Sequence, residues 1–157
     1  MLLNDGIFRE YDIRGIAGKE LNRDIAITIG MAFGTYVNSK LRTQNSNLKV
    51  SVGRDVRLSS EELASGIIEG ITSSGIDVYD IGICPTPLQY FSIYHLNLDG
   101  GIMVTGSHNP PEYNGFKLSV GKDTIHGKDI QRLKEIALNQ AKEKVKVEGG
   151  AVKTYNI

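Results

Sequence analysis

The chain has 157 residues, 40% of them hydrophobic, which is the size and composition of one compact domain. Its 18 Lys and Arg residues balance 18 Asp and Glu residues, so no net field draws nucleic acid to the surface, and any anion must be bound locally. No apolar run approaches the roughly 20 residues that span a bilayer, and the start lacks the basic and apolar regions of a secretion signal. The lone Cys84 makes no internal disulfide, which is typical of a cytoplasmic protein. From the charge balance and the short apolar runs, we expect neither nucleic-acid nor membrane partners.

Short β-rich runs alternate with longer amphipathic stretches along the chain. This alternation is typical of an α/β protein, and we predict a three-layer α/β/α fold around a mixed, mainly parallel sheet. In chain order, the predicted elements are a helix from Asn22 to about Lys40, a strand at 48–53, a helix at 60–74, a strand at 76–81, a helix at 87–96, strands at 101–105 and 115–120, and a helix at 128–142. The last two strands are predicted to pair with each other.

The starts of the first three helices carry capping signals. Asn22 is the predicted N-cap of the first helix, because its side chain can accept an unpaired backbone N–H. Ser59 and Glu62 have the S-x-x-E spacing of a capping box at the second helix. Thr86 is the predicted N-cap of the third helix, because Pro87 after it fits the first helical position.

The composition becomes polar after the last predicted helix, around 148–150. We therefore predict one domain at 1–145 and the start of a linker to a missing second domain at 146–157. Residues 152–157 have no core of their own to join, which leads us to expect that another part of the protein normally follows them.

The most reactive side chains lie at 105–117, which is the loop between the two strands predicted to pair together with the adjoining ends of those strands. A hydroxyl, an imidazole, an amide and an amine occur there after a buried strand, and ligands of open α/β sheets bind beyond the carboxyl ends of strands. Ser107 is the natural nucleophile or phosphate carrier. Gly106 would let the backbone pass close to a ligand, while Pro110 and Pro111 would stiffen the loop. The alternative interpretation is an ordinary polar turn between strands.

Two strings of residues resemble the α-D-phosphohexomutases, which interconvert sugar 1-phosphates and sugar 6-phosphates. The loop reads T-G-S-H-N-P followed by Y-N-G-F-K, which is similar to the phosphoserine loop of the phosphomannomutase/phosphoglucomutase branch. The segment F-R-E-Y-D-I-R-G at 8–15 resembles the family's opening string. A third, weaker match contains Asp55, Arg57 and Ser59, and we assign it mainly to structure. The resemblance runs from about Ile7 to Ala141 and implies the N-terminal phosphoserine domain, domain I, of such an enzyme.

The resemblance implies that Ser107 carries a phosphoryl group in the resting enzyme. Phospho-Ser107 would donate this group to a hexose phosphate, mannose or glucose, giving a hexose 1,6-bisphosphate that turns in the site and returns its other phosphoryl group. Mg²⁺ is implied too, with one ligand from the phosphate on Ser107 and the others from a D-G-D loop in a second domain that this sequence lacks. We therefore expect negligible mutase activity from the chain without the missing C-terminal domains.

The resemblance also implies catalytic roles for three other residues. Lys117 would be the proton-transfer group at the sugar hydroxyl, or else a solvated lysine at a strand end. His108 would orient the phosphoserine or share in proton transfer, or else be a hydrogen-bonded loop histidine. Arg14 would clamp the transferring phosphoryl group, or else form a structural ion pair with Asp12.

Three more residues are predicted to bind substrate, namely Tyr11, Asn109 and Asn114. Tyr11 would line the sugar pocket, although a half-buried strand tyrosine is an equally good interpretation.

Two other functions are alternatives to the mutase. One is a serine hydrolase built on Ser107 and His108, although the chain lacks a G-x-S-x-G elbow and an implied orienting acid. The other is a stand-alone phosphosugar-binding or interaction module that uses the same loop, because a fold alone does not determine a function.

Overall fold

The computed structural model describes residues 2–42, 47–141 and 149–157. Within these ranges the helices are η1 (Asp5–Ile7), a short 3-10 helix, and the α-helices α1 (Arg23–Leu41), α2 (Ser60–Ser73), α3 (Thr86–His95) and α4 (Lys128–Gln140). The strands are β1 (Ile13–Ile16), β2 (Lys49–Arg54), β3 (Asp77–Ile83), β4 (Gly100–Val104), β5 (Tyr113–Val120), β6 (Asp123–Thr124) and β7 (Val152–Thr154). The predicted helices and strands are present, whereas η1, β1, β6 and β7 were not predicted.

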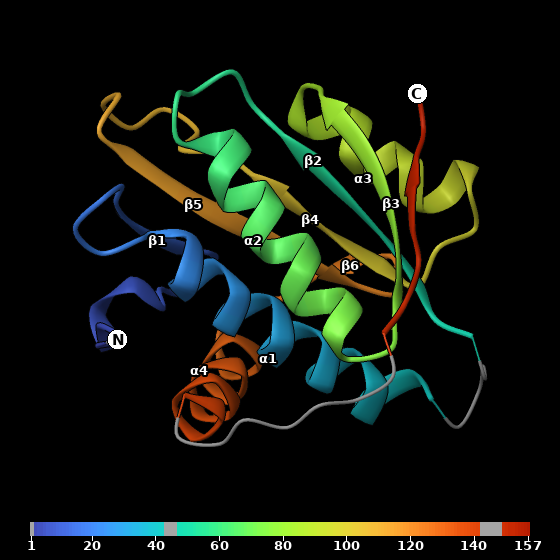
Figure 1. The fold of residues 1–157 in the computed structure, drawn as a ribbon, viewed down its shortest axis with the longest axis horizontal. Helices are drawn as coiled ribbons and strands as arrows, with labels where there is room; N and C mark the ends of the chain where they lie inside the picture. Colours follow the sequence, from blue (N-terminus) through green and yellow to red (C-terminus); the bar gives the residue numbers. More distant parts are fainter. Residues whose placement is uncertain (1, 43–46, 142–148) are drawn as a thin grey trace.

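The strands form one mixed sheet in the order β1-β5-β4-β2-β3-β7, with β6 paired to β5 (Figure 1). Strands β4, β2, β3 and β7 run parallel to one another, while β5 is antiparallel to both β4 and β1. The predicted pairing of the two strands around the polar loop is confirmed, with Ile102 opposite Leu118 and Val104 opposite Phe116. The hairpin of β4 and β5 therefore carries the loop at the carboxyl end of β4.

Helices cover both faces of the sheet, which confirms the three-layer prediction. Successive side chains of β4 point to opposite faces. Ile102 and Val104 join the large core that α1, α2 and α4 cover, whereas Met103 joins a smaller cluster against which Leu88 of α3 packs. Because close packing holds β4 on both faces, the position of the loop at its end is well defined.

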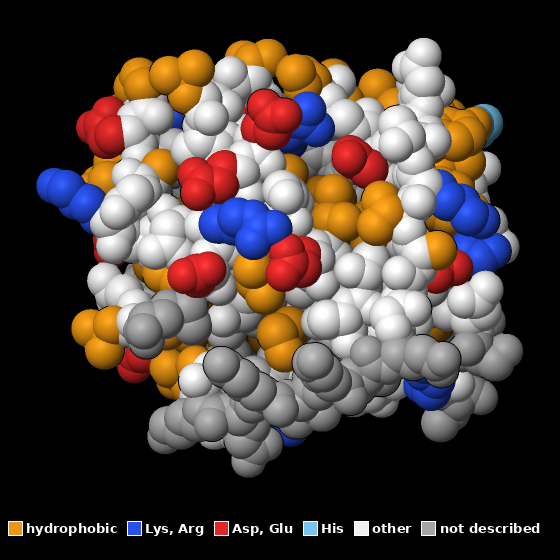
Figure 2. Space-filling view, in the orientation of Figure 1, with side chains coloured by type: hydrophobic (Ala, Val, Ile, Leu, Met, Phe, Trp, Pro, Cys, Tyr) orange, Lys and Arg blue, Asp and Glu red, His pale blue; other side chains and the backbone are white. Residues whose placement is uncertain are grey.

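Helices α1 and α2 lie side by side on one face of the sheet (Figure 1). Their contact depends on glycine, since a Cβ added at Gly70 would lie 2.2 Å from the carbonyl oxygen of Ile27. Acidic and basic side chains are interspersed on this face of the molecule (Figure 2). None of the described helices is long and apolar enough to cross a membrane.

The helix starts agree with the sequence prediction at α1 and differ from it at α2 and α3. The Asn22 side chain accepts a backbone N–H of α1 at 3.0 Å, as predicted. Ser59 is the N-cap of α2 but makes no capping hydrogen bond, and its hydroxyl accepts the side-chain amide of Asn114 instead. The predicted capping box is therefore wrong. The N-cap of α3 is Pro85, so Thr86 is the first helical residue and not the cap.

The last described residues belong to the sheet. Strand β7 pairs with β3, placing Val152 opposite Val78, and the Tyr155 N–H donates to the carbonyl of Asp80 at 2.9 Å. Tyr155 and Ile157 also pack against the smaller core cluster. The expectation that residues 152–157 have no core to join is therefore wrong, because β3 offers them an edge with hydrogen-bonding groups to pair. The predicted domain boundary at 145 lies outside the described residues and stays a prediction.

Candidate functional site

The polar loop begins at the carboxyl end of β4, beside the carboxyl end of β2. The two strands are parallel, with Arg54 opposite Val104, and the Asp55 N–H donates to the carbonyl of Val104 at 2.9 Å. This register brings Asp55 next to Thr105, although 50 positions separate them in the chain. The loop therefore lies at the edge where open α/β sheets bind ligands.

The Asp55 carboxylate holds the first residues of the loop. Its Oδ2 accepts the Thr105 hydroxyl at 2.8 Å and the Gly106 N–H at 3.2 Å, and its Oδ1 accepts the Arg57 N–H at 3.1 Å and the Ser60 hydroxyl. Burial by itself would raise the pKa of Asp55. The four donors, with Ser60 foremost, outweigh burial and hold the pKa of this carboxyl below its usual range.

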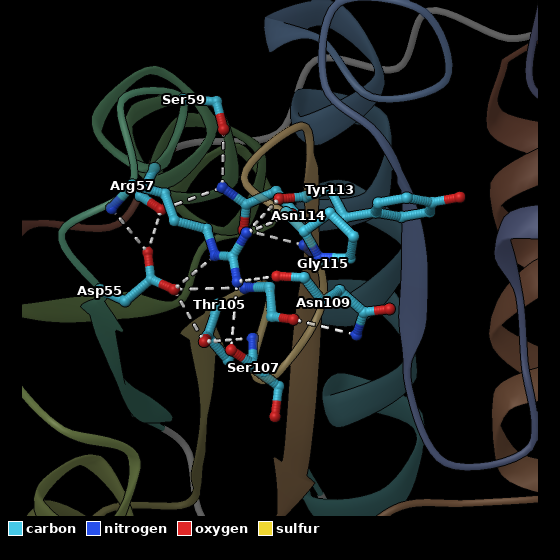
Figure 3. Close-up of polar contacts among 12 residues, drawn as sticks. Asp55, Arg57, Ser59, Thr105, Ser107, Asn109, Tyr113, Asn114 and Gly115 are labelled. Carbon is cyan, nitrogen blue, oxygen red and sulfur yellow. Dashed lines mark hydrogen bonds and ion pairs between the residues drawn. The ribbon is translucent and has the colours of Figure 1, made fainter.

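The Arg57 guanidinium binds the backbone of the loop (Figure 3). Its two terminal nitrogens donate to four carbonyl oxygens, those of Ser107 (3.1 Å), Asn109 (2.7 Å), Pro110 (2.6 Å) and Tyr113 (3.1 Å). Its third nitrogen, Nε, lies 3.3 Å from Oδ2 of Asp55, which balances the positive charge. One side chain from the β2–α2 connection thus binds the loop at four points between Ser107 and Tyr113.

Asn114, near the start of β5, is fully buried. Its Nδ2 donates to the hydroxyl oxygens of Ser59 at 2.8 Å and Ser60 at 2.9 Å, and its Oδ1 accepts the Gly115 N–H at 2.8 Å. Both ends of the amide are therefore engaged inside the protein. In this structure Asn114 ties the far end of the loop to the start of α2, and substrate binding by this residue stays a prediction.

Ser107 has a backbone φ of +55°, which for a residue other than glycine costs of order 1–3 kcal/mol. Hydrogen bonds on both sides stabilise this conformation, since the Ser107 N–H donates to Thr105 Oγ1 at 2.9 Å and its carbonyl accepts Arg57. The Ser107 hydroxyl has no hydrogen-bond partner among the described residues, and its side chain points away from Arg57 (Figure 3). The backbone of Ser107 is thus fixed while its hydroxyl is open to a ligand.

A surface hollow beside the loop brings Ser107, His108 and Lys117 together, and Cys84 and Thr86 are also in its lining. His108 is exposed and Lys117, from β5, is half-buried. Within the described ranges, neither side chain forms an ion pair or a hydrogen bond. A free hydroxyl and two groups that can transfer protons therefore face one opening.

Arg14 and Tyr11 do not line this hollow. Arg14, on β1, forms the predicted ion pair with Asp12, and its buried Nε has no hydrogen-bond partner among the residues that the structure describes. Tyr11 precedes β1 and is 71% exposed, with its ring centroid 6.2 Å from that of His126. The interpretation of Tyr11 as a half-buried strand residue is therefore wrong, and the phosphoryl-binding role of Arg14 stays a prediction.

Gly106 and Asn109 shape the turn around Ser107. A Cβ added at Gly106 would lie 2.3 Å from the guanidinium carbon of Arg57, so the packing of Arg57 already requires glycine here, and the predicted close approach to a ligand stays a prediction. The backbone and side-chain amides of Asn109 donate to the Gly106 carbonyl at 3.0 and 3.1 Å. Substrate binding by Asn109 stays a prediction.

The residues around Ser107 do not by themselves form a Mg²⁺ site. Asp55 is the carboxylate that shares the hollow with Ser107, and both of its oxygens already accept hydrogen bonds. No group of three His, Cys, Asp or Glu side chains suited to a metal is present among the described residues. A phosphate on Ser107 could offer one oxygen ligand, whereas Mg²⁺ prefers a nearly complete octahedron.

Comparison with known proteins decides the family. Residues 5–144 match the family model "Phosphoglucomutase/phosphomannomutase, alpha/beta/alpha domain I". The chain belongs to this family. A phosphomannomutase of Salmonella typhimurium is 47% identical over 133 residues, covering 82% of this chain and 27% of the relative. A phosphoglucomutase of Neisseria meningitidis is 46% identical over 127 residues, covering 81% of this chain and 26% of the relative.

A solved structure agrees with this family assignment. The crystal structure of a phosphoglucomutase/phosphomannomutase family protein from Burkholderia thailandensis superimposes with a TM-score of 0.87 and 37% identity, covering 99% of this chain and 34% of that one. The chain therefore spans about a quarter of the length of the curated relatives it matches and about a third of this solved structure.

Sequence reasoning missed most of the polar frame that supports Ser107 in this domain I. Asp55 and Arg57 were noted in the weakest of the three matching strings, but Ser60 and the buried position of Asn114 were not foreseen. The available signal was the cluster of charged and hydroxyl residues directly after a buried strand, a placement that favours a site over a turn.

Proposed function

We propose that this chain is the phosphoserine domain of a cytoplasmic phosphohexomutase that interconverts hexose 1-phosphate and hexose 6-phosphate, with mannose or glucose as the sugar. The observation that carries the proposal is Ser107, whose backbone is held on both sides while its hydroxyl is unpartnered among the described residues. Lys117 and His108 line the same hollow. The names of the relatives, phosphoglucomutase and phosphomannomutase, support the class of substrate.

In the proposed reaction, a free hydroxyl of a hexose monophosphate attacks the phosphorus of phospho-Ser107. The P–O bond to Ser107 Oγ breaks as the P–O bond to the sugar forms, Lys117 takes the proton of the sugar hydroxyl, and His108 supplies a proton to the released Oγ. The product is hexose 1,6-bisphosphate. After it turns in the site, Ser107 takes back the other phosphoryl group with the protons moving in reverse, so the net reaction is an isomerisation.

Arg14 is the proposed clamp for the transferring phosphoryl group. Its charge is permanent, and its planar fork of donors matches phosphate oxygens. Among the described residues, one terminal nitrogen of Arg14 pairs with Asp12 and the buried Nε makes no hydrogen bond, so the pair with Asp12 does not use all of its donors.

The complete reaction would need groups beyond this chain. Mg²⁺, when bound, would neutralise charge on the phosphoryl oxygens, with the phosphate on Ser107 as one ligand and further domains as the source of the others. Because the described residues around Ser107 do not form that metal site, we propose that the chain alone has negligible mutase activity.

Mass spectrometry of the full-length protein after incubation with hexose 1,6-bisphosphate tests the function. We expect one phosphoryl group on Ser107, mutase turnover of glucose 1-phosphate or mannose 1-phosphate, and loss of both in Ser107→Ala. Ser73→Ala is the matched control, because within the described part of the chain the Ser73 hydroxyl bonds to the Gly70 carbonyl of its own helix α2 and to no other group. This control should keep both properties.

Two outcomes would contradict the mutase. Binding of a hexose phosphate by a wild-type protein that neither becomes phosphorylated nor turns it over would favour the binding module. Ester hydrolysis that a serine-acylating reagent abolishes would favour the hydrolase. Mutase turnover by residues 1–157 alone would contradict only the proposed inactivity of the isolated chain.

A further inference from the structure

We propose that Arg57 is a positioning residue for phosphoryl transfer, which sets the conformation of Ser107 without binding phosphate itself. The inference rests on the proposed function, which it deepens by naming the residue that holds the phosphoryl carrier in place. It is carried by the four hydrogen bonds between the Arg57 guanidinium and the carbonyl oxygens of the loop.

The donors of Arg57 all face groups inside the protein, four of them in hydrogen bonds and one in an ion pair. A guanidinium has five N–H groups in a planar fork. Four of them belong to the two terminal nitrogens and go to the loop, and the fifth, on Nε, faces Asp55 at 3.3 Å. Arg57 could therefore hold a phosphate only by releasing the loop, which separates its role from that proposed for Arg14.

The geometry connects Arg57 directly to the conformation of Ser107. The carbonyl of Ser107 is one of the four acceptors, and its N–H is held on the other side by Thr105. Because the φ of +55° at Ser107 is unfavourable for a residue with a side chain, we expect the loop to relax once the guanidinium no longer holds that carbonyl. The Ser107 hydroxyl would then leave its position over the hollow.

Two neighbouring residues, Gly106 and Asp55, help to hold the Arg57 guanidinium in place. Gly106 packs under the guanidinium, where any Cβ would lie 2.3 Å from its central carbon. Asp55 balances the charge of Arg57, and only 15% and 21% of the Arg57 and Asp55 side chains are exposed, so water competes weakly for the pair. A lysine at this position would carry the same charge but lacks the planar fork that reaches four carbonyls at once.

Kinetics of the full-length protein test the inference. We expect Arg57→Lys to lower kcat by about 100-fold, the cost of misplacing a reacting group by about 1 Å, while KM for the hexose phosphate stays within about threefold. Gly106→Ala should likewise lower kcat with little change in KM, because the new Cβ would push the guanidinium away from the loop while residue 57 remains an arginine. Guanidinium ion added to Arg57→Ala should restore part of the lost kcat.

Arg54→Lys is the matched control. Arg54 is the last residue of β2, and its guanidinium lies 3.9 Å from Asp80. Within the described ranges it donates no hydrogen bond to a carbonyl of the loop, so kcat and KM should both stay at the wild-type values. An unchanged kcat in Arg57→Lys would overturn the inference. A large rise in KM with an unchanged kcat would overturn it too, because that result is expected of a residue that binds the substrate phosphate.

Amide hydrogen exchange separates a failure of this inference from a failure of the proposed function. In Arg57→Lys, the amides of residues 106–113 should exchange at least about tenfold faster, as expected for a locally released segment, while those of β2 and β4 stay protected. If the wild type shows no mutase turnover, the proposed function fails, and exchange still reports whether Arg57 holds the loop. Wild-type exchange of the loop in Arg57→Lys would overturn the inference.

Discussion

Replacing Asp55 by asparagine keeps the size of the side chain but turns one of its two acceptor oxygens into a donor. An amide nitrogen in place of Oδ2 would face the Thr105 hydroxyl and the Gly106 N–H. In the flipped orientation it would face the Arg57 N–H and the Ser60 hydroxyl. Either way two hydrogen bonds to a charged acceptor are lost, at about 1.5 kcal/mol each, so we expect the free energy of unfolding to fall by about 3 kcal/mol.

Thermal unfolding followed by circular dichroism measures this loss. For a chain of this size about 1 kcal/mol corresponds to roughly 2–4 °C in Tm, so Asp55→Asn should unfold about 6–12 °C below the wild type. Asp80→Asn is the control, because Asp80 is more exposed and lies 3.9 Å from Arg54. Its Oδ1 also accepts the Gly82 N–H at 3.0 Å, and asparagine keeps one such oxygen, which predicts a loss of about 1 kcal/mol or less. Equal Tm values for Asp55→Asn and the wild type would refute the role of the carboxylate.

The pH dependence provides a second check on Asp55. Its pKa in the folded chain lies below the usual 3.8, so its charge stabilises the fold above that pH. This contribution is lost as the pH falls through the lower, folded-state pKa. The difference in Tm between the wild type and Asp55→Asn should therefore be constant from about pH 7 to 5 and shrink below about pH 4. A difference that does not shrink in acid would contradict this reasoning.

Three further substitutions test other parts of the fold. Tyr36→Phe removes a 2.7 Å hydrogen bond to Asp129 and should lower the free energy of unfolding in urea by about 1.5–3 kcal/mol. Burial, helped by that hydrogen bond, raises the pKa of Tyr36 above its usual 10.0, so the wild type should lose stability as the pH rises past about 10 and the variant should not. Gly70→Ala would put a Cβ 2.2 Å from the Ile27 carbonyl oxygen and should lower the free energy of unfolding by about 1–3 kcal/mol, seen as a lower urea midpoint. An unchanged midpoint would show that α1 and α2 separate without cost. Gly150→Ala would put a Cβ 2.0 Å from the carbonyl oxygen of the residue before β3, so the amides of β7 should exchange faster while those of β2 do not.

Regular elements and the reactive loop were predictable because their signals are local. Helical spacing of apolar residues predicts α1, α2 and α4, and the alternating pattern of 115–120 predicts a strand that pairs with its neighbour across one loop. The string at 105–117 pointed to Ser107, His108 and Lys117 together, and the structure places all three at one hollow. A short connection leaves these residues few other arrangements.

Strands β1 and β7 were missed because neither has a pattern of its own. β1 is four residues long and includes Arg14 and Gly15, and β7 has three exposed residues. Each becomes a strand only because an edge of the sheet is available to pair with it, β5 for β1 and β3 for β7. No window of sequence contains both partners of such a pair.

The sequence by itself determined the α/β class, the loop between β4 and β5, and the chemical groups that this loop carries. Only the tertiary structure decided how the loop is held, because the register of β2 against β4 brings Asp55 and Arg57 to it from 50 or more positions away. The acceptors that Arg57 binds are backbone carbonyls, which every residue possesses. No pattern of side chains could therefore have named them, and their selection depends on where the folded chain places them in space.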